Sequence, residues 1–284
     1  MSRYIFEMQD LHFNYPDGTA ALQGLSVSIE RNKKIALLGA NGAGKSTFLL
    51  HLIGILKPVK GKIIFNGQEL KYDRASLINL RNKVGYVFQD PEIQLFSASV
   101  WQEVSFGPMN LGLTNEDVEN RVIRALKDTD TTCLKDRPTH FLSYGQKKLI
   151  SIADILAMNP DMIIFDEPTA SLDPKYTHRI LDLLNDINQR GVSIVMATHD
   201  VDKAYEWADT ILVMKDGWII KAGPPEEIFN NEHLIQNTSL EKPLLLKIFK
   251  ELQLNGYLPQ NRTAPRNVNQ FIEILHQNAL NKAL

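Results

Sequence analysis

The residues with the clearest chemistry lie in one glycine-rich stretch, residues 39–47, which reads GANGAGKST. It fits the phosphate-binding loop pattern G-x-x-x-x-G-K-[ST], in which small residues let backbone N–H groups turn inward around an anion. The ammonium of Lys45 can reach the β- and γ-phosphates of a nucleotide, and the hydroxyl of Ser46 can bind Mg²⁺. The loop residues that we expect to contact the nucleotide are Gly39, Ala40, Asn41, Gly42, Ala43, Gly44, Lys45, Ser46 and Thr47.

The sequence on either side of this loop has the context that the motif requires. Residues 34–38 predict a buried strand, and residues 48–53 predict the start of a helix with an apolar face. The positive N-terminal end of that helix would lie under the phosphates. The alternative is a glycine-rich turn that binds nothing, and the order of strand, loop and helix disfavours it.

Two carboxylates follow a second apolar segment. Residues 162–165 read MIIF and predict a buried strand, and Asp166 and Glu167 come directly after it. This is a Walker B pattern, in which Asp166 would hold Mg²⁺ directly or through water and Glu167 would act as general base on the attacking water. The alternative is a core strand with a polar end, which the phosphate-binding loop in the same chain disfavours.

Three more candidates flank predicted strands. In open α/β sheets, the groups that contact ligands gather at the carboxyl ends of the strands. Gln89 follows a strand predicted at 84–88, where it either reaches Mg²⁺ and the attacking water or ends the strand as a polar cap. His199 follows a later buried strand and could contact the γ-phosphate or water, although a single histidine is more often structural. Tyr15 either stacks on an adenine base or packs in the core.

Composition and charge exclude several classes of protein. The chain has 284 residues, of which 44% are hydrophobic and 23% charged, as in soluble globular proteins. The net charge of −2 provides no basic field, so we expect no nucleic-acid partner. Cys133 is the single cysteine, which excludes an intrachain disulfide framework. We find no signal-peptide layout and no apolar run of about 18–20 residues, so another chain must supply any membrane part.

Beyond these motifs, the pattern predicts a helical block inserted among strands. Residues 90–160 lack strand alternation, and Pro108 and Gly112 are expected to break the first helical segment. Other predicted strands lie at 5–15, 25–30, 62–65 and 192–197, a hairpin at 211–221, and helices at about 114–126, 145–158, 174–190, 244–252 and 268–275. The last two helices belong to a polar tail and would pack on the domain or on a partner.

Residues 142–146, Leu-Ser-Tyr-Gly-Gln, resemble the LSGGQ signature of ATP-binding cassette (ABC) ATPases. The segment lies between Gln89 and Asp166, as in that family, and the resemblance extends over about residues 4–230. Tyr144 departs from the pattern, because the common signature has glycine there. The resemblance implies the following further contacts with ATP: Ser143, Gly145, Gln146 and Asp173. It also supports adenine stacking by Tyr15, catalytic roles for Gln89, Glu167 and His199, and Mg²⁺ binding by Ser46, Gln89 and Asp166.

The same resemblance implies the fold and the working assembly. The fold would be an α/β phosphate-loop NTPase of the ABC type, with a mixed core sheet, flanking helices, an antiparallel β subdomain and an inserted helical subdomain. The nucleotide-binding domain would cover 1–230, with its helical subdomain at about 90–160, and 231–284 would form a C-terminal helical extension. Two such domains would form a head-to-tail dimer, either a homodimer or a heterodimer with a similar ATPase, with ATP between them.

A narrower resemblance lies in residues 87–96 and continues to Glu103 and to Phe106-Gly107-Pro108. This part is similar to the ATPase subunits of energy-coupling factor importers, most of all the cobalt-import type. The resemblance implies an ATPase at the cytoplasmic face of the cell membrane, peripheral to a membrane coupling protein and a substrate-binding membrane protein. A motor for a vitamin or nickel importer is the alternative within transport. A soluble ABC ATPase of translation or DNA repair is disfavoured, because the chain has one cassette and no long coiled-coil insert.

Overall fold

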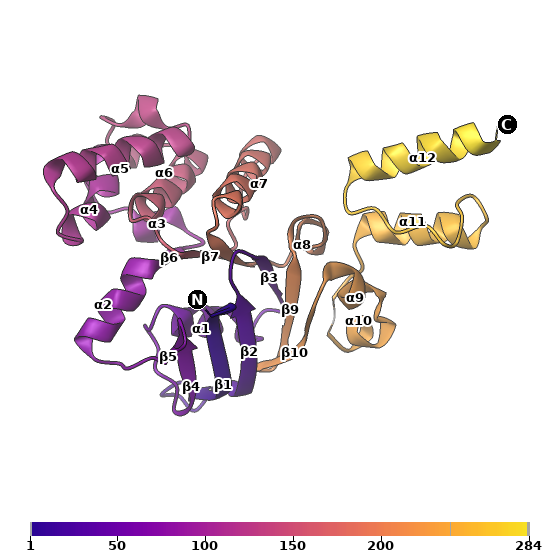
Figure 1. The fold of residues 1–284 in the computed structure, drawn as a ribbon, viewed down its shortest axis with the longest axis horizontal. Coiled ribbons are helices and arrows are strands. Elements are labelled where there is room, and N and C mark those ends of the chain that lie inside the picture. Colours follow the sequence, from indigo (N-terminus) through magenta and orange to yellow (C-terminus); the bar gives the residue numbers. More distant parts are fainter. Residues whose placement is uncertain (1, 239, 283–284) are drawn as a thin grey trace.

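The computed structural model describes residues 2–238 and 240–282. Its main sheet has six strands in the order β10-β9-β3-β8-β7-β6, all parallel to their neighbours except β10, which is antiparallel to β9. The strands are β3 (Lys34–Leu38), β6 (Val84–Val87), β7 (Met162–Asp166), β8 (Ser193–Ala197), β9 (Thr210–Lys215) and β10 (Trp218–Gly223). The mixed sheet expected from the sequence is therefore confirmed (Figure 1).

A second, antiparallel sheet lies beside the first (Figure 1). Its strands, in spatial order, are β2 (Ala20–Glu30), β1 (Tyr4–Asn14), β4 (Lys60–Phe65) and β5 (Gln68–Glu69). The strand predicted at 25–30 begins earlier, at Ala20, because its first half also pairs with β1. Helix α1 (Lys45–Leu52) lies between the two sheets, and its Phe48 and Leu49 are fully buried in the core that they share.

The main sheet is buried on both faces. Successive residues of its strands therefore pack alternately into two different cores. In β3, Ile35 and Leu37 belong to the core around α1, whereas Ala36 and Leu38 face a second core. That second core is closed by α7 (Pro174–Gln189), α8 (Val201–Trp207), α9 (Pro225–Asn230) and α10 (Glu232–Thr238). This double burial holds the carboxyl ends of the parallel strands at one rigid edge.

Helices form the stretch between β6 and β7. They are α3 (Pro91–Gln94), α4 (Val100–Asn110), α5 (Asn115–Asp128) and α6 (Tyr144–Ala157), with two 3₁₀ turns at Thr132–Leu134 and Thr139–Phe141. Pro108 does not break the first segment as expected, since it lies inside α4 near its end. There the missing N–H costs one hydrogen bond of the last turn, and the helix ends two residues later, before Gly112.

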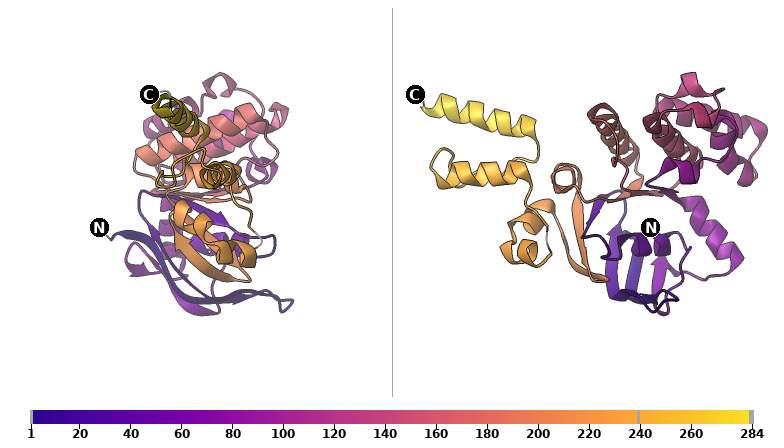
Figure 2. Two further views of the ribbon diagram at one scale, coloured as in Figure 1. Left: turned by 90° about the vertical axis from the view of Figure 1, so that its right-hand side faces the viewer. Right: turned by 180° about the vertical axis from the view of Figure 1, so that it is seen from behind.

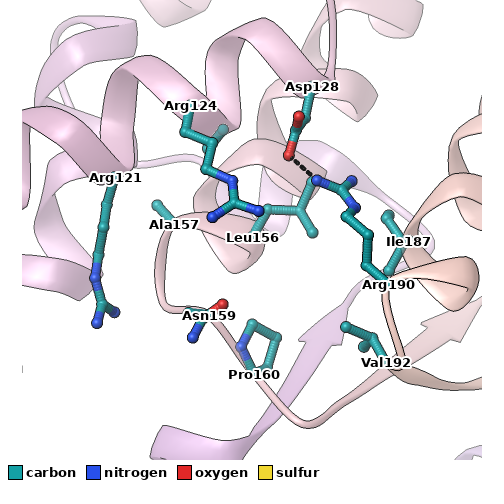
Figure 3. A pocket seen from close by; sticks show the side chains of 11 residues that line it. Arg121, Arg124, Asp128, Leu156, Ala157, Asn159, Pro160, Ile187, Arg190 and Val192 are labelled. Carbon is teal, nitrogen blue, oxygen red and sulfur yellow. Dashed lines mark hydrogen bonds and ion pairs between the residues drawn. The ribbon is translucent and has the colours of Figure 1, made fainter. Parts of the chain in front are cut away.

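Helix α6 joins this helical block to the main sheet. Its Leu149 and Ile152 pack in the core over the sheet, and its Ile150 and Ala153 pack in the core of the helical block. A hollow of about 320 Å³ remains in the seam between α5, α6 and α7, and Figure 3 shows three arginines around it. Arg190 of α7's C-cap pairs with Asp128 of α5 across this seam.

Four helices, at residues 74–83, 201–207, 225–230 and 232–238, were not predicted from the sequence, whereas both C-terminal helices were, at about 244–252 and 268–275. Helix α2 (Arg74–Lys83) buries only Leu80, so it has no apolar stripe to show its period. The C-terminal helices α11 (Leu244–Leu254) and α12 (Val268–Lys282) project together from the body (Figures 1 and 2). Arg266, between them, donates to the carbonyl oxygens of Tyr205 and Ala208 at 2.7 and 2.5 Å and so ties this pair to the end of α8. Within the described residues, no helix has the length and apolarity needed to cross a bilayer.

Candidate active site

A cavity of about 490 Å³ lies at the carboxyl edge of the main sheet. Strands β3, β6, β7 and β8 run parallel, so the segments that follow them meet at this edge. Most of the residues singled out in the sequence line it: Tyr15, Asn41, Gly42, Gly44, Lys45, Ser46, Thr47, Gln89, Asp166, Glu167 and His199. The order of the strands thus brings residues as far apart in sequence as Tyr15 and His199 to one site.

The glycine-rich loop connects β3 to α1, and its last glycine has a conformation that other residues rarely adopt. Gly44 has φ of 100°, and a Cβ atom there would lie 2.6 Å from the carbonyl oxygen of Ala21. Gly44 is also the N-cap of α1, and no side chain caps this end. The first N–H groups of α1 are therefore free of side-chain partners and suited to bind an anion.

Lys45 is the first residue of α1 and lies over the loop. Its ammonium donates to the carbonyl oxygens of Gly39 at 2.7 Å and Ala40 at 3.1 Å. Burial lowers the pKa of Lys45, and the carboxylates of Glu167 and Asp166 oppose this shift. The positive charge thus stands between the loop and the two acids, where phosphate oxygens would meet it.

Asp166 ends β7 beside the hydroxyl groups of two other elements. Its Oδ2 accepts from Tyr86 Oη at 3.0 Å and lies 3.4 Å from Ser46 Oγ. Gln89 lines the same cavity, so residues that carry hydroxyl, carboxylate and amide oxygens share it. Oxygen donors are the ligands that Mg²⁺ prefers, and this set fits that ion. Tyr86 was missed in the sequence, where it reads as one more apolar residue of the 84–88 strand.

Glu167 and His199 form a pair. The backbone of Glu167 has φ of 47°, and its N–H donates to the carbonyl oxygen of Ala197 at 3.0 Å. This turns the chain at the end of β7 and brings Glu167 Oε2 to 3.0 Å from His199 Nδ1. The Glu167 side chain is 13% exposed and that of His199 73% exposed. The imidazole can therefore orient the carboxylate while its Nε2 is accessible to a ligand.

Tyr15 follows the end of β1, at the rim of the cavity. It is 36% exposed, its hydroxyl lies 2.9 Å from Thr47 Oγ1, and its ring meets that of Phe13 edge-on at 5.1 Å. The sequence left two interpretations of Tyr15, packing in the core or stacking on an adenine base. Its exposed position at the rim excludes the first and is compatible with the second.

Several predicted residues lie outside this cavity. Gly39 and Ala40 line a neighbouring hollow that also includes His199, and Ala43 is buried beneath the loop. The signature residues and Asp173 lie at the first turns of α6 and α7. There Ser143 and Gln146 cap α6 reciprocally, and Asp173 Oδ1 accepts from Tyr176 N at 2.9 Å as the N-cap of α7.

Comparison with known proteins identifies the family. The ABC transporter family model matches residues 22–170. The energy-coupling factor transporter ATP-binding protein EcfA of Methanocaldococcus jannaschii is 46% identical over 256 residues, which cover 90% of this chain and 92% of that protein. EcfA of Methanococcus maripaludis is 47% identical over 274 residues, 95% of this chain and 99% of that protein.

Solved structures agree with this assignment. CbiO1 from Clostridium perfringens, described as part of the ABC transporter complex CbiONQ, has a TM-score of 0.77 and 43% identity, with 89% of this chain and 100% of that chain covered. The ATP-binding cassette MJ0796, solved as a dimer bound to ADP and Pi, has a TM-score of 0.70 and 26% identity over 78% of this chain and 98% of that chain. The chain therefore belongs to the ABC transporter family, as an ATP-binding and ATP-hydrolysing subunit of the energy-coupling factor group.

Proposed function

We propose that this chain is the motor subunit of an energy-coupling factor importer and that the imported substrate is a cobalt ion. The observation that carries the motor assignment is the cavity in which Lys45, Asp166, Glu167 and His199 meet. Cobalt is supported by the resemblance of residues 87–96 to cobalt-import ATPases. A nickel or vitamin importer is the alternative, because the transported substrate need not touch this chain.

The geometry supports a specific division of roles in ATP hydrolysis. The loop N–H groups and Lys45 would bind the phosphates, and Tyr15 would stack on the adenine. Ser46, Gln89 and Asp166 would hold Mg²⁺, which would neutralise charge on the phosphate oxygens. Glu167, oriented by His199, would take the proton of a water whose oxygen bonds to the γ-phosphorus as the bond to the bridging oxygen breaks.

A head-to-tail dimer would complete this site. Ser143, Gly145, Gln146 and Asp173 lie outside the cavity of their own chain, so a second subunit must supply these contacts if they reach ATP. Two cavities would then enclose two ATP molecules between the subunits. The partner would be a second copy of this chain or a similar ATPase.

The helical block offers the surface for the membrane partners. Residues 1–230 would form the nucleotide-binding domain, its part at 90–160 would contact a membrane coupling protein, and 231–284 would extend it. Phe96 and Phe106 are exposed and meet edge-on at 4.9 Å, and Ile93 and Met109 are exposed nearby in sequence. Such an apolar patch fits a protein interface. The chain would thus lie peripherally at the cytoplasmic face of the membrane, in complex with the coupling protein and a substrate-binding membrane protein.

The test is uptake of labelled cobalt, nickel and a vitamin panel by vesicles that contain this chain and its membrane partners, each beside Glu167→Gln. We expect cobalt uptake that stops in the variant, and a hydrolysis rate lowered about 10²–10⁴-fold with ATP binding retained. Glu69→Gln, at an exposed site on β5, is the matched control. Variant-sensitive uptake of nickel or a vitamin would overturn cobalt, and intact ATPase activity without any uptake would overturn the transport function.

A further inference from the structure

Lys148 carries a buried ammonium on the helix that begins with the signature. The residue is 1% exposed, and its Nζ donates to the carbonyl oxygens of Phe88 at 2.6 Å and Gln89 at 3.0 Å. Lysine is rarely buried without a carboxylate partner, yet among the described residues Lys148 has no ion pair. Burial lowers the pKa of Lys148 to about 8, so keeping this charge inside the protein has a cost.

The two carbonyl groups belong to the segment that carries Gln89 into the cavity. Strand β6 ends at Val87, so sheet pairing no longer holds the residues that follow. Gln89 lines the cavity, and its carbonyl oxygen accepts hydrogen bonds from α6. The ammonium of Lys148 therefore fixes the backbone from which the Gln89 side chain extends.

Other side chains of α6 bond the same segment. Tyr144 Oη donates to the carbonyl oxygen of Gln89 at 3.3 Å, and Lys147 pairs with Glu92. The structure thus gives a role to Tyr144, where the common signature has glycine: it reaches over the start of the segment in its own chain.

Gln94 closes the segment at its far end. Its Oε1 accepts from Phe88 N at 3.3 Å, while its Nε2 donates to the carbonyl oxygen of Ser151 at 2.8 Å and to Asp154 Oδ2 at 3.2 Å. Residues 88–94 are therefore bonded to α6 from Tyr144 to Asp154, which is about three turns of the helix. Lys148 and Tyr144 both bond the Gln89 carbonyl, and the bond from Lys148 is the shorter, at 3.0 Å against 3.3 Å. Lys148 is also the more buried of the two side chains.

We infer that Lys148 is a positioning residue for Gln89: its ammonium holds the main chain of Phe88 and Gln89 on the signature helix and so keeps the Gln89 side chain in the nucleotide cavity. The signature at the start of α6 and the backbone of Gln89 would then move together as one rigid unit. This inference rests on the role proposed above for Gln89 in binding Mg²⁺ and water.

The first test compares the purified full chain with Lys148→Met and Lys148→Arg. We expect Lys148→Met to lower kcat about 10- to 100-fold and to raise the Mg²⁺ concentration for half-maximal rate, with the KM for ATP changed less than about twofold. Lys148→Arg keeps donors for both carbonyls and should recover most of the rate. Lys71→Met makes the same change at an exposed site outside the helical block and serves as the control. A parallel loss of kcat, ATP binding and thermal stability would show a merely structural role and overturn the inference.

The second test is a double-mutant cycle with Gln89→Ala. If Lys148 acts through Gln89, adding Lys148→Met to Gln89→Ala lowers kcat no further, whereas independent effects multiply and would refute the inference. Lys148→Gln, which keeps one donor, supplies the cycle if Lys148→Met does not fold. A wild-type kcat in Gln89→Ala alone would instead refute the proposed role of Gln89, so the two failures are distinguishable.

Discussion

Asp166 is held from two sides, by the hydroxyl of Tyr86 at 3.0 Å and that of Ser46 at 3.4 Å. Burial, with Asp166 as a second cause, raises the pKa of Tyr86, so its proton stays on the hydroxyl at any working pH. Tyr86 therefore always donates to Oδ2, and the other oxygen of the carboxylate would be left for the Mg²⁺ proposed above. Groups that orient a metal ligand in this way contribute to affinity without touching the metal.

Tyr86→Phe removes this donor and nothing else of the side chain. We expect the Mg²⁺ concentration for half-maximal ATPase rate to rise about 10-fold, because an unoriented Asp166 binds the ion less well. Titration of the rate with Mg²⁺ at saturating ATP measures this. Tyr72→Phe is the matched control, since the Tyr72 hydroxyl is buried with no hydrogen-bond partner among the described residues. An equal shift in both variants would contradict the role of Tyr86.

Helix α6 connects the helical block, the segment at 88–94 and the main sheet. It begins with the capping box of Ser143 and Gln146, bonds residues 88–94 along its side, and packs on two cores. Its second residue, Gly145, faces Tyr176 of α7, and a Cβ atom there would lie 2.8 Å from the ring. The glycine of the signature thus has a packing reason within one chain, besides any contact with a partner's ATP.

Gly145→Ala should lower the free energy of unfolding by about 1–3 kcal/mol, because the ring and helix must move apart. Urea denaturation measures this loss. In a Tyr176→Ala background the added methyl has room, and we expect most of the penalty to disappear. The same penalty in both backgrounds would show that crowding against Tyr176 is not its cause.

Asp154 gives α6 a pH-dependent stability. Burial raises its pKa to about 7, Glu103 adds to the shift and the Gln94 amide opposes it. Between about pH 4 and 7 the folded chain therefore holds a proton that the unfolded chain releases, and the stability that this proton provides falls by up to about 1.4 kcal/mol per pH unit.

Asp154→Asn removes this proton binding, and its amide can still accept the Gln94 bond. We expect the variant to gain stability relative to wild type as pH rises from 5 to 7, with a constant difference above about pH 8. Urea midpoints of both proteins at each pH provide the comparison. A difference that does not change with pH would refute the raised pKa.

The whole molecule presents two separate halves of a composite site. The cavity opens at the sheet edge, whereas the signature lies on the helical block, which Figure 1 shows to one side of α1. In the proposed head-to-tail dimer, a second chain in the opposite orientation would bring its signature to this cavity. Assembly is then expected to depend on ATP, because the nucleotide would provide part of the interface.

With Mg²⁺ and ATP, Glu167→Gln should have twice the 32.2 kDa mass of one chain. Without nucleotide, it should have the mass of one chain. When hydrolysis is blocked, the proposed dimer with bound ATP accumulates. Light scattering after size exclusion measures its mass. Adding Lys45→Ala weakens phosphate binding and should restore the single-chain mass. A single chain in the presence of bound ATP would contradict the homodimer and favour a different ATPase as partner.

The sequence by itself determined the phosphate-binding loop, the Walker B acids and most of the strands around them. The backbone conformation of these segments depends mainly on residues that are close in sequence. A glycine such as Gly44 indicates a position where φ is positive. The residues that follow the strands could be expected in one site because the carboxyl ends of parallel strands meet at one edge. The fold class followed from the resemblance of the ordered motifs to ABC ATPases. Helix α2 escaped prediction because it buries only Leu80 and so has no apolar stripe in its sequence.

Only the tertiary structure decided which side chains meet across elements. Tyr86 on Asp166, Lys148 on the Gln89 carbonyl and Glu167 on His199 join residues that are between 32 and 80 positions apart. Strand order and the packing of α6 create these contacts, and no local pattern encodes either. A buried lysine such as Lys148 would also be predicted from the sequence to lie at the surface. The carbonyl groups that accept its hydrogen bonds come close to it only in the folded chain.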